Sequence, residues 1–312
     1  MVSASTTGIA KPKETQVGFV GIGIMGLAMA NNLLKEGYEV LVWNRSPDRC
    51  NALREAGARV LGSAAEVAQQ SDITIGMLAD PAAALDVALG EKGVVAGLSA
   101  GKGYVDASTV DAGTAKKISE AVKATGADYL EAPVSGSKQP AEQGTLIFLT
   151  GGDEALFNRA GPLLDVMGKA KFFLGDVGAG ANMKLAVNLT MGDMMVAFAE
   201  GMALAKVSGL SADDFTKVVG LGALAAPMFG LKGPSMAKEQ YPTAFPLKHQ
   251  QKDLRLALEL AAEHRQTLPL TSTANDLYLQ AQKAGRGDDD FSGVMAAVLA
   301  GSTTSQEAKA IT

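Results

Sequence analysis

A run of small and apolar residues near the start of the chain, QVGFVGIGIMG at 16–26, contains three glycines in the spacing G-x-G-x-x-G. The apolar run before them predicts a strand, and helical spacing of apolar residues begins at Met25. In such a turn the first glycine permits the tight bend, the second lets a pyrophosphate approach the backbone, and the third lets the helix pack on the strand. The start of the helix attracts phosphates. We therefore expect a dinucleotide-binding turn, with a turn that binds no ligand as the alternative; its residues are Gly21, Ile22, Gly23, Ile24, Met25 and Gly26.

The first half of the chain alternates short apolar runs with segments of helical spacing. Alternation of this kind predicts βαβ units on a parallel sheet with right-handed crossovers. The expected strands are 17–22, 39–43, 73–78, 104–107, 129–132, 146–150 and 172–174, and the clearest expected helices are 25–36, 63–70, 112–124 and 154–167.

The second half changes character after GDVGAG at 175–180. Long apolar-periodic segments follow, and no convincing strand is among them. The expected helices are 183–207, 212–221, 252–265, 272–284 and 291–299. We therefore predict an α/β fold in which a doubly wound, Rossmann-type parallel sheet at 17–177 is followed by an all-helical domain for substrate binding and dimerisation at 178–312, joined by a long interdomain helix.

The overall composition narrows the class of protein. A length of 312 residues suits about two domains, and a net charge of −5 argues against nucleic acid or an anionic membrane surface as a partner. No apolar run reaches the roughly 18 residues that a membrane span needs, because Asp193 and Glu200 interrupt the longest one. One cysteine, Cys50, and two histidines make a disulfide framework or a metal site unexpected, and Cys50 is expected to be a packing residue.

The first sixteen residues are small, polar and aperiodic, so we expect a disordered tail at 1–16. A plain tail or expression remnant is favoured over the stub of a removed presequence, because the segment lacks arginine. The expected location is the cytoplasm, or a plastid or mitochondrion if the tail is such a stub. We also expect a homo-oligomer, dimer or tetramer.

The end of the second expected strand, VLVWNRS, indicates which dinucleotide is bound. An NAD site has an acidic residue there for the ribose hydroxyls, whereas this chain has Asn44, Arg45 and Ser46. An amide, a guanidinium and a hydroxyl suit a 2′-phosphate, which arginine binds through charge-assisted hydrogen bonds. The cofactor is therefore expected to be NADP(H), although Arg45 as a solvated residue beside Asp48 is the alternative.

Lys184 lies among apolar neighbours in GAGANMKLAVN at 178–188. A snorkelling lysine, with its stem buried and its head in water, is one explanation. However, Gly180, Lys184 and Asn188 are spaced four apart and share one helix face, and apolar surroundings favour proton release by an ammonium group. Gly180 would let substrate or nicotinamide approach the backbone, and Asn188 would orient the ammonium or bind substrate.

Three further stretches, EAPVSGSKQPAEQGTL (131–146), GANMKLAVN (180–188) and KHQQKDLRLAL (248–258), resemble motifs of the β-hydroxyacid dehydrogenase family, in the family's order and spacing. The resemblance runs from about Val17 to Leu299. Among family members the chain is most similar to plant-type glyoxylate/succinic semialdehyde reductases, through WNRS, SGKGYVDASTVD, KGPSM and YPTAFPLKHQQKDLRLAL. Glu131 and Ser137 stand where many members have Asp and Gly, and the reductase subgroup shares both.

The resemblance implies roles for individual residues. Lys184 would donate the proton, and Asn188, Ser135 and Asp253 would complete the catalytic set. Ser135, Gly136 and Ser137 would hold the substrate carboxylate; Thr109 would reach the nicotinamide ribose or the substrate, and Ser108 beside it either joins it or caps the next helix. Met77, Leu78 and Lys252 would contact the cofactor, and Phe245 would form a wall of the pocket. For Lys252, Asp253 and Phe245 the alternatives are an ion pair at a helix start and a core aromatic residue.

The function implied is NADPH-dependent reduction of small aldehyde acids, glyoxylate to glycolate and succinic semialdehyde to 4-hydroxybutyrate. The alternatives are an NAD-dependent 3-hydroxyisobutyrate-type dehydrogenase and, from another class, a non-catalytic dinucleotide-binding module that serves assembly. No metal is expected.

Overall fold

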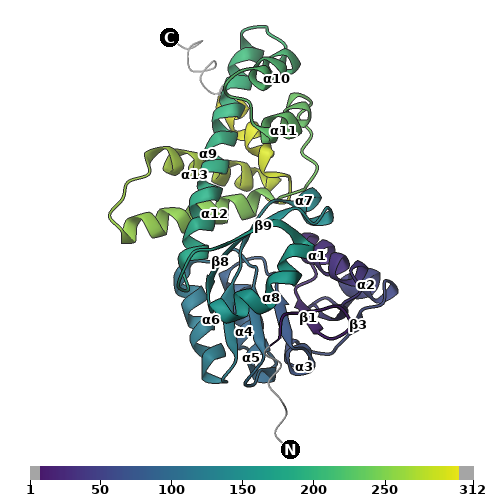
Figure 1. Ribbon diagram of the computed structural model, residues 1–312. Coiled ribbons are helices and arrows are strands. Elements are labelled where there is room, and N and C mark those ends of the chain that lie inside the picture. Colours follow the sequence, from purple (N-terminus) through teal and green to yellow (C-terminus); the bar gives the residue numbers. More distant parts are fainter. Residues whose placement is uncertain (1–7, 302–312) are drawn as a thin grey trace, which may run out of the picture. The chain divides into compact units, whose positions relative to one another are not determined.

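The computed structural model describes residues 8–301, and the chain divides by compactness between Leu185 and Ala186. The first unit is built on a sheet, and the second is helical (Figure 1). The predicted boundary near Gly178 lies at the start of helix α9 (Ala179–Val207), whereas the division by compactness falls inside that helix.

The sheet of the first unit has the strand order β3-β2-β1-β4-β5-β6-β8-β7, with β9 paired to β8. Strands β1 to β6 are all paired in parallel, as expected from the alternation of strands and helices. The sheet is not wholly parallel, because β8 runs antiparallel to both β6 and β7. The strands are β1 Gln16–Val20, β2 Glu39–Trp43, β3 Arg59–Val60, β4 Ile73–Gly76, β5 Gly103–Asp106, β6 Asp128–Glu131, β7 Val134–Ser135, β8 Leu146–Gly152 and β9 Gly168–Phe173.

Helices cover both faces of this sheet, which confirms the doubly wound Rossmann-type arrangement. Buried side chains of α1 and α8 cluster with Val17 and Phe19, while those of α3 and α6 cluster with Val20 and Tyr104 on the opposite face. The alternation of side chains along β1 produces this division. The helices are α1 Ile24–Lys35, η1 Pro47–Cys50, α2 Asn51–Glu55, α3 Ala64–Gln70, α4 Pro81–Leu89, α5 Val94–Gly97, α6 Ala112–Ala124, α7 Lys138–Glu142 and α8 Glu154–Met167.

The second unit is helical, as predicted, around a core that includes Met195 and Phe198 of α9, Leu254 of α12 and Tyr278 of α13. The expected helix at 212–221 has the predicted bounds, whereas α12 begins five residues earlier than expected, after Pro246. The helices are α10 Ala212–Leu221, α11 Pro227–Ala237, α12 Leu247–Glu263, α13 Pro269–Ala281, η2 Gln282–Arg286 and η3 Phe291–Val294. None of the helices within 8–301 is long and apolar enough to cross a membrane.

Part of the segment expected to be a disordered tail is ordered. The amide of Ala10 donates to the carbonyl of Arg159 at 3.0 Å, and Ala10 is buried, so contact with the first unit holds this stretch in place. Residues 1–7 of the expected tail lie outside the described residues. Cys50 is fully buried, as expected of a packing residue.

Candidate active site

The carboxyl ends of the central strands lie level with one another. The register pairs Val20 with Trp43 on one side and with Gly76 on the other, Gly76 with Asp106, and Asp106 with Glu131. Because the chain leaves β1 toward β2 and β3 and then returns to β4 on the other side, the strand order reverses at β1. Ligands of open α/β sheets bind outside the carboxyl ends at this reversal point, and the glycine motif lies there.

The glycine turn has the geometry that each position of the motif requires. Gly21 has a φ of +95°, and a Cβ on it would lie 2.3 Å from the Met77 carbonyl oxygen. A Cβ on Gly26 would lie 2.0 Å from the Gly21 carbonyl oxygen, so the helix can start here only with glycine. A Cβ on Gly23, by contrast, would meet no atom within 4 Å.

The open space at Gly23 and the uncapped start of α1 fit a dinucleotide. Gly23 is the N-cap of α1, and no side chain caps the helix there. The first amides of a helix point outward and attract a phosphate. Ile22 is buried, Met25 is half-buried and Ile24 is exposed, so the turn combines apolar support with accessible backbone.

The end of β2 is hydrogen-bonded to the glycine turn through Asn44. The side-chain oxygen of Asn44 accepts from the Ile22 amide at 2.9 Å, and its Nδ2 donates to the Ser46 carbonyl at 2.9 Å. Asn44 therefore braces the glycine turn with its own amide group. Arg45 and Ser46 are exposed, and within residues 8–301 Arg45 forms no ion pair with Asp48.

Ser108, for which the sequence left two roles open, links the ends of β4 and β5. Ser108 accepts from the Leu78 amide at 2.9 Å, while its own amide donates to Asp106 Oδ1 at 3.0 Å. Ser108 does not cap the following helix, because Asp111 does so. Met77, Leu78 and Thr109 are each half-buried at this edge.

The Ser135 loop leaves the carboxyl end of β6 and pairs with β8. Ser135 lies in β7, opposite Ile147, and is half-buried. Gly136 has a φ of +130°, and a Cβ there would lie 2.7 Å from Leu146, so the chain can turn sharply only at a glycine. Ser137 is the N-cap residue of the short helix α7 and makes no side-chain cap hydrogen bond.

Helix α9 begins beside the end of β6 and carries Lys184. Lys184 is 5% exposed, which the snorkelling explanation does not account for. Gly180 has a packing role that the sequence did not indicate. A Cβ on it would lie 2.3 Å from the Leu149 carbonyl oxygen, so this glycine lets α9 pack against β8. Glu131 Oε1 accepts from the amides of Gly178 and Gly180 at 2.8 and 2.7 Å.

In the helical unit, three polar side chains form a buried chain of contacts. Asn188 Nδ2 donates to Asp253 Oδ2 at 2.5 Å, and Lys252 Nζ lies 2.9 Å from Asp253 Oδ1 in an ion pair that lacks hydrogen-bond geometry. Asn188 and Asp253 are 2% and 1% exposed. Gln250, which the sequence analysis did not single out, is fully buried and donates to the Asn188 carbonyl at 3.0 Å. Its only sequence signal is its position in the KHQQKDL motif.

Phe245 is held by a buried carboxylate that the sequence analysis also left unassigned. Asp290 Oδ2 accepts from the amides of Ala244 and Phe245 at 3.1 and 3.2 Å and from Lys232 Nζ at 2.7 Å. The Phe245 ring packs edge-on against Phe291 with centroids 5.9 Å apart. The segment that presents Phe245 is therefore fixed by a buried ion pair and by backbone hydrogen bonds.

The predicted site residues thus form two groups, one in each unit. The sheet edge carries the glycine turn, the ends of β2, β4 and β5, the Ser135 loop and Lys184. The helical unit carries Asn188, Lys252, Asp253 and Phe245, with Asn188 one turn beyond Lys184 along α9. Within the described residues, no group of three or more His, Cys, Asp or Glu side chains could hold a metal ion.

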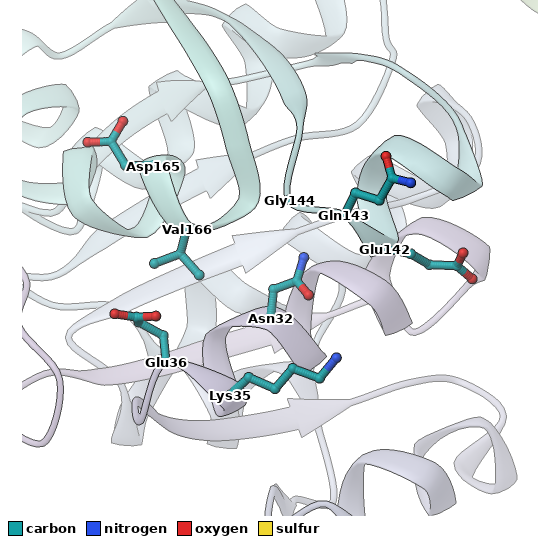
Figure 2. A pocket seen from close by; sticks show the side chains of 8 residues that line it. All are labelled: Asn32, Lys35, Glu36, Glu142, Gln143, Gly144, Asp165 and Val166. Carbon is teal, nitrogen blue, oxygen red and sulfur yellow. The ribbon is translucent and has the colours of Figure 1, made fainter.

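An open pocket of 570 Å³ lies elsewhere in the first unit (Figure 2). Its lining comes from the ends of α1 and α8 and from the turn after α7, and it includes Lys35, Glu36, Glu142 and Asp165. It shares no residue with the predicted cofactor or substrate sites. Its mixed charges are those of an ordinary solvated surface.

Two family profiles together cover almost the whole described chain. Residues 16–175 match the NAD-binding domain of 6-phosphogluconate dehydrogenase, and residues 178–298 match the profile described as NAD-binding of NADP-dependent 3-hydroxyisobutyrate dehydrogenase. These matches divide the chain at the turn before α9.

Known proteins similar to this chain agree with the profiles. Two Arabidopsis thaliana proteins, glyoxylate/succinic semialdehyde reductase 2, chloroplastic, and glyoxylate/succinic semialdehyde reductase 1, are 55% and 54% identical to it. The alignments cover 91% of this chain in both cases, and 79% and 98% of the two relatives. The solved structure of 3-hydroxyisobutyrate dehydrogenase from Salmonella typhimurium has 31% identity and a TM-score of 0.84, over 90% of this chain and 99% of its own. The chain is an NADP(H)-dependent oxidoreductase and belongs to the β-hydroxyacid dehydrogenase family.

Proposed function

We propose that this protein reduces small aldehyde acids with NADPH, converting glyoxylate to glycolate and succinic semialdehyde to 4-hydroxybutyrate. The observation that carries the proposal is the 54–55% identity, over 91% of the chain, to two reductases named for these substrates. A buried lysine at the start of α9, in a chain with two histidines, supports the same chemistry.

The proposed reaction needs a hydride and a proton at the aldehyde group. The reduced nicotinamide supplies the hydride to the carbonyl carbon when it is bound. Lys184 Nζ then delivers a proton to the carbonyl oxygen, where negative charge develops. As an ammonium group, Lys184 also stabilises that charge before the proton moves. Its burial suits this role because a poorly solvated ammonium gives up its proton more readily.

The remaining site residues are assigned to orientation. Ser135 and the amides of Gly136 and Ser137 hold the substrate carboxylate, and Thr109 contacts the nicotinamide ribose or the substrate. Asn188 and Asp253, already joined by a hydrogen bond, orient Lys184 or the substrate, and Phe245 forms an apolar wall. We assign cofactor binding to the glycine turn from Gly21 to Gly26, to Met77, Leu78 and Lys252, and to Asn44, Arg45 and Ser46 near the 2′-phosphate. Asn44 also supports the turn by accepting from the Ile22 amide.

The test replaces Lys184 with alanine. We expect kcat for glyoxylate to fall on the order of 10²-fold or more, as for loss of a general acid, while NADPH binding, measured by fluorescence titration, is retained. Lys117→Ala, which changes an exposed lysine of α6, is the matched control and leaves both quantities unchanged. Near-normal turnover by Lys184→Ala would rule out this assignment. It would then favour a different proton donor.

Steady-state assays of the wild-type protein distinguish the alternative functions. The 3-hydroxyisobutyrate-type alternative is supported by the 31% identical Salmonella typhimurium structure. We expect higher kcat/KM for glyoxylate and succinic semialdehyde with NADPH than for methylmalonate semialdehyde with NADH. No turnover with any of the three aldehydes, combined with intact NADPH binding, would instead support the non-catalytic assembly module.

We further propose that the chain forms a homo-oligomer, dimer or tetramer, through its helical unit. Several large apolar side chains there are exposed, including Leu204, Leu210 and Leu221 at 66%, 66% and 90%. Ten of the sixteen exposed large apolar side chains in the described residues lie in this unit, and exposed apolar surface of this kind is typical of an interface. Light scattering on the purified chain gives the mass, and a monomer at micromolar concentration contradicts the proposal.

The location is proposed to be the cytoplasm, or a plastid or mitochondrion. One relative is named chloroplastic, which supports the plastid alternative. Imaging a C-terminal fluorescent fusion in plant cells separates the three compartments.

A further inference from the structure

Glu131 is buried where β6 ends and α9 begins, and the proposed reaction gives it no role. It is 2% exposed, and its Oε1 accepts from the Gly178 and Gly180 amides at 2.8 and 2.7 Å. The first amides of a helix have no acceptor within the helix, and a carboxylate is favourable at a helix N-terminus. Glu131 therefore satisfies the start of α9 from a different element, 47 and 49 residues away in sequence.

The backbone of two glycines packs closely against this oxygen. A Cβ on Gly151 of β8 would lie 2.6 Å from Glu131 Oε1, and a Cβ on Gly180 would lie 3.1 Å from it. The same Gly180 Cβ would lie 2.3 Å from the Leu149 carbonyl oxygen. Strands β6 and β8 and the first turn of α9 thus meet around one carboxylate oxygen.

We propose that Glu131 is a positioning residue that fixes the first turn of α9 and thereby the placement of Lys184, one turn beyond Gly180. The proposal rests on the proposed role of Lys184 as the proton donor. Glu131 also connects the two proposed substrate contacts, the Ser135 loop and Lys184, because it precedes Ser135 by only four residues. One rigid strand end then sets both the carboxylate clamp and the proton donor.

Glu131 has two titratable neighbours on the sheet, and its acceptor oxygen is the property that we assign to the positioning of α9. Asp106 is its register partner on β5, and burial raises the pKa of both carboxyl groups, that of Glu131 to about 7. Tyr129, on the same face of β6, is fully buried, and its pKa is raised as well, first by burial. The property that positions α9 is the acceptor oxygen, which glutamine keeps, and leucine of similar size lacks.

The experiment compares Glu131→Leu with Glu131→Gln. Hydrogen exchange at the amides of residues 178–182 is expected to quicken about tenfold or more in Glu131→Leu, and its kcat to fall about tenfold or more, with KM for NADPH within about threefold of wild type. Glu131→Gln is expected to stay within about threefold of wild type in all three quantities. Glu154→Gln, at an exposed acid in the first turn of α8, is the matched control. A purely structural role would lower thermal stability without this loss of kcat in the folded enzyme.

A double-mutant cycle with Lys184→Ala separates this proposal from the proposed function. If Glu131 acts through Lys184, Glu131→Leu lowers kcat little further in the Lys184→Ala background. An equal fall in both backgrounds overturns the positioning role, whatever Lys184→Ala itself does. Near-normal turnover by Lys184→Ala alone refutes the proposed function, and the exchange data still report whether Glu131 holds α9. If Glu131→Leu does not fold, Glu131→Asp takes its place, because its side chain is one methylene shorter. It is expected to lower kcat at least threefold. Unchanged kcat and unchanged hydrogen exchange at residues 178–182 in Glu131→Asp would overturn the proposal.

Discussion

Glu131→Gln should change how the stability of the protein depends on pH. The Glu131 carboxyl is buried at the end of β6, and desolvation raises its pKa from 4.5 to about 7, although the Gly178 and Gly180 amides act in the opposite direction. In the unfolded chain the same carboxyl has its ordinary pKa near 4.5. Glutamine cannot ionise, so the variant lacks this contribution.

The sign and size follow from proton linkage. Below pH 4.5 the carboxyl is protonated in both states. Between pH 4.5 and about 7 the unfolded chain loses its proton while the folded chain keeps it, so stability falls as pH rises. At about 1.36 kcal/mol for each pKa unit, the full loss is about 3.4 kcal/mol, of which about 2.5 kcal/mol lies between pH 5 and pH 8. Asp106 is present in both proteins and largely cancels in the comparison.

The measurement is urea unfolding of wild type and Glu131→Gln at pH 5 and pH 8. Trp43 is the only tryptophan in the chain and lies in β2, so its fluorescence reports unfolding of the first unit. The free energy of unfolding of wild type minus that of the variant is expected to be lower at pH 8 by about 2.5 kcal/mol. A difference that is the same at both pH values would refute the reasoning, because Glu131 would then ionise alike in both states.

Three further predictions concern other parts of the site. Gly26→Ala puts a Cβ 2.0 Å from the Gly21 carbonyl oxygen, so NADPH binding should be lost and unfolding should become easier by about 1–3 kcal/mol; calorimetry and titration measure both. Arg45→Ala should raise KM for NADPH about tenfold or more while leaving KM for NADH unchanged, as measured in steady-state assays. Equal changes with both cofactors would contradict the assignment of Arg45 to the 2′-phosphate. Asn188→Ala leaves Asp253 without its 2.5 Å hydrogen bond, so chemical unfolding should require about 1–3 kcal/mol less, and no loss would show that water replaces the amide.

Some features of this protein follow from local sequence. The glycine turn was predictable because its three glycines lie within six residues of one another in a recognisable spacing. The buried strands β1, β2 and β4 to β6 were predictable because they appear in the sequence as short, mostly apolar runs. Short elements without a period, such as β7 at Val134–Ser135, carry no such signal and were not predicted. The likeness of whole motifs indicated the family and the reductase chemistry.

Tertiary structure decided the contacts between residues that lie far apart in the chain. Nothing near Gly180 in the sequence shows that its missing Cβ makes room for the carbonyl of Leu149, and nothing near Asn188 shows that its amide meets Asp253, 65 residues on. In the sequence Glu131 is only a conservative change within a motif, whereas in the fold it accepts hydrogen bonds from the Gly178 and Gly180 amides. Propensity and periodicity are properties of neighbours along the chain, whereas the partner of a buried polar group is chosen by the packing of the whole unit, which must satisfy every polar atom removed from water.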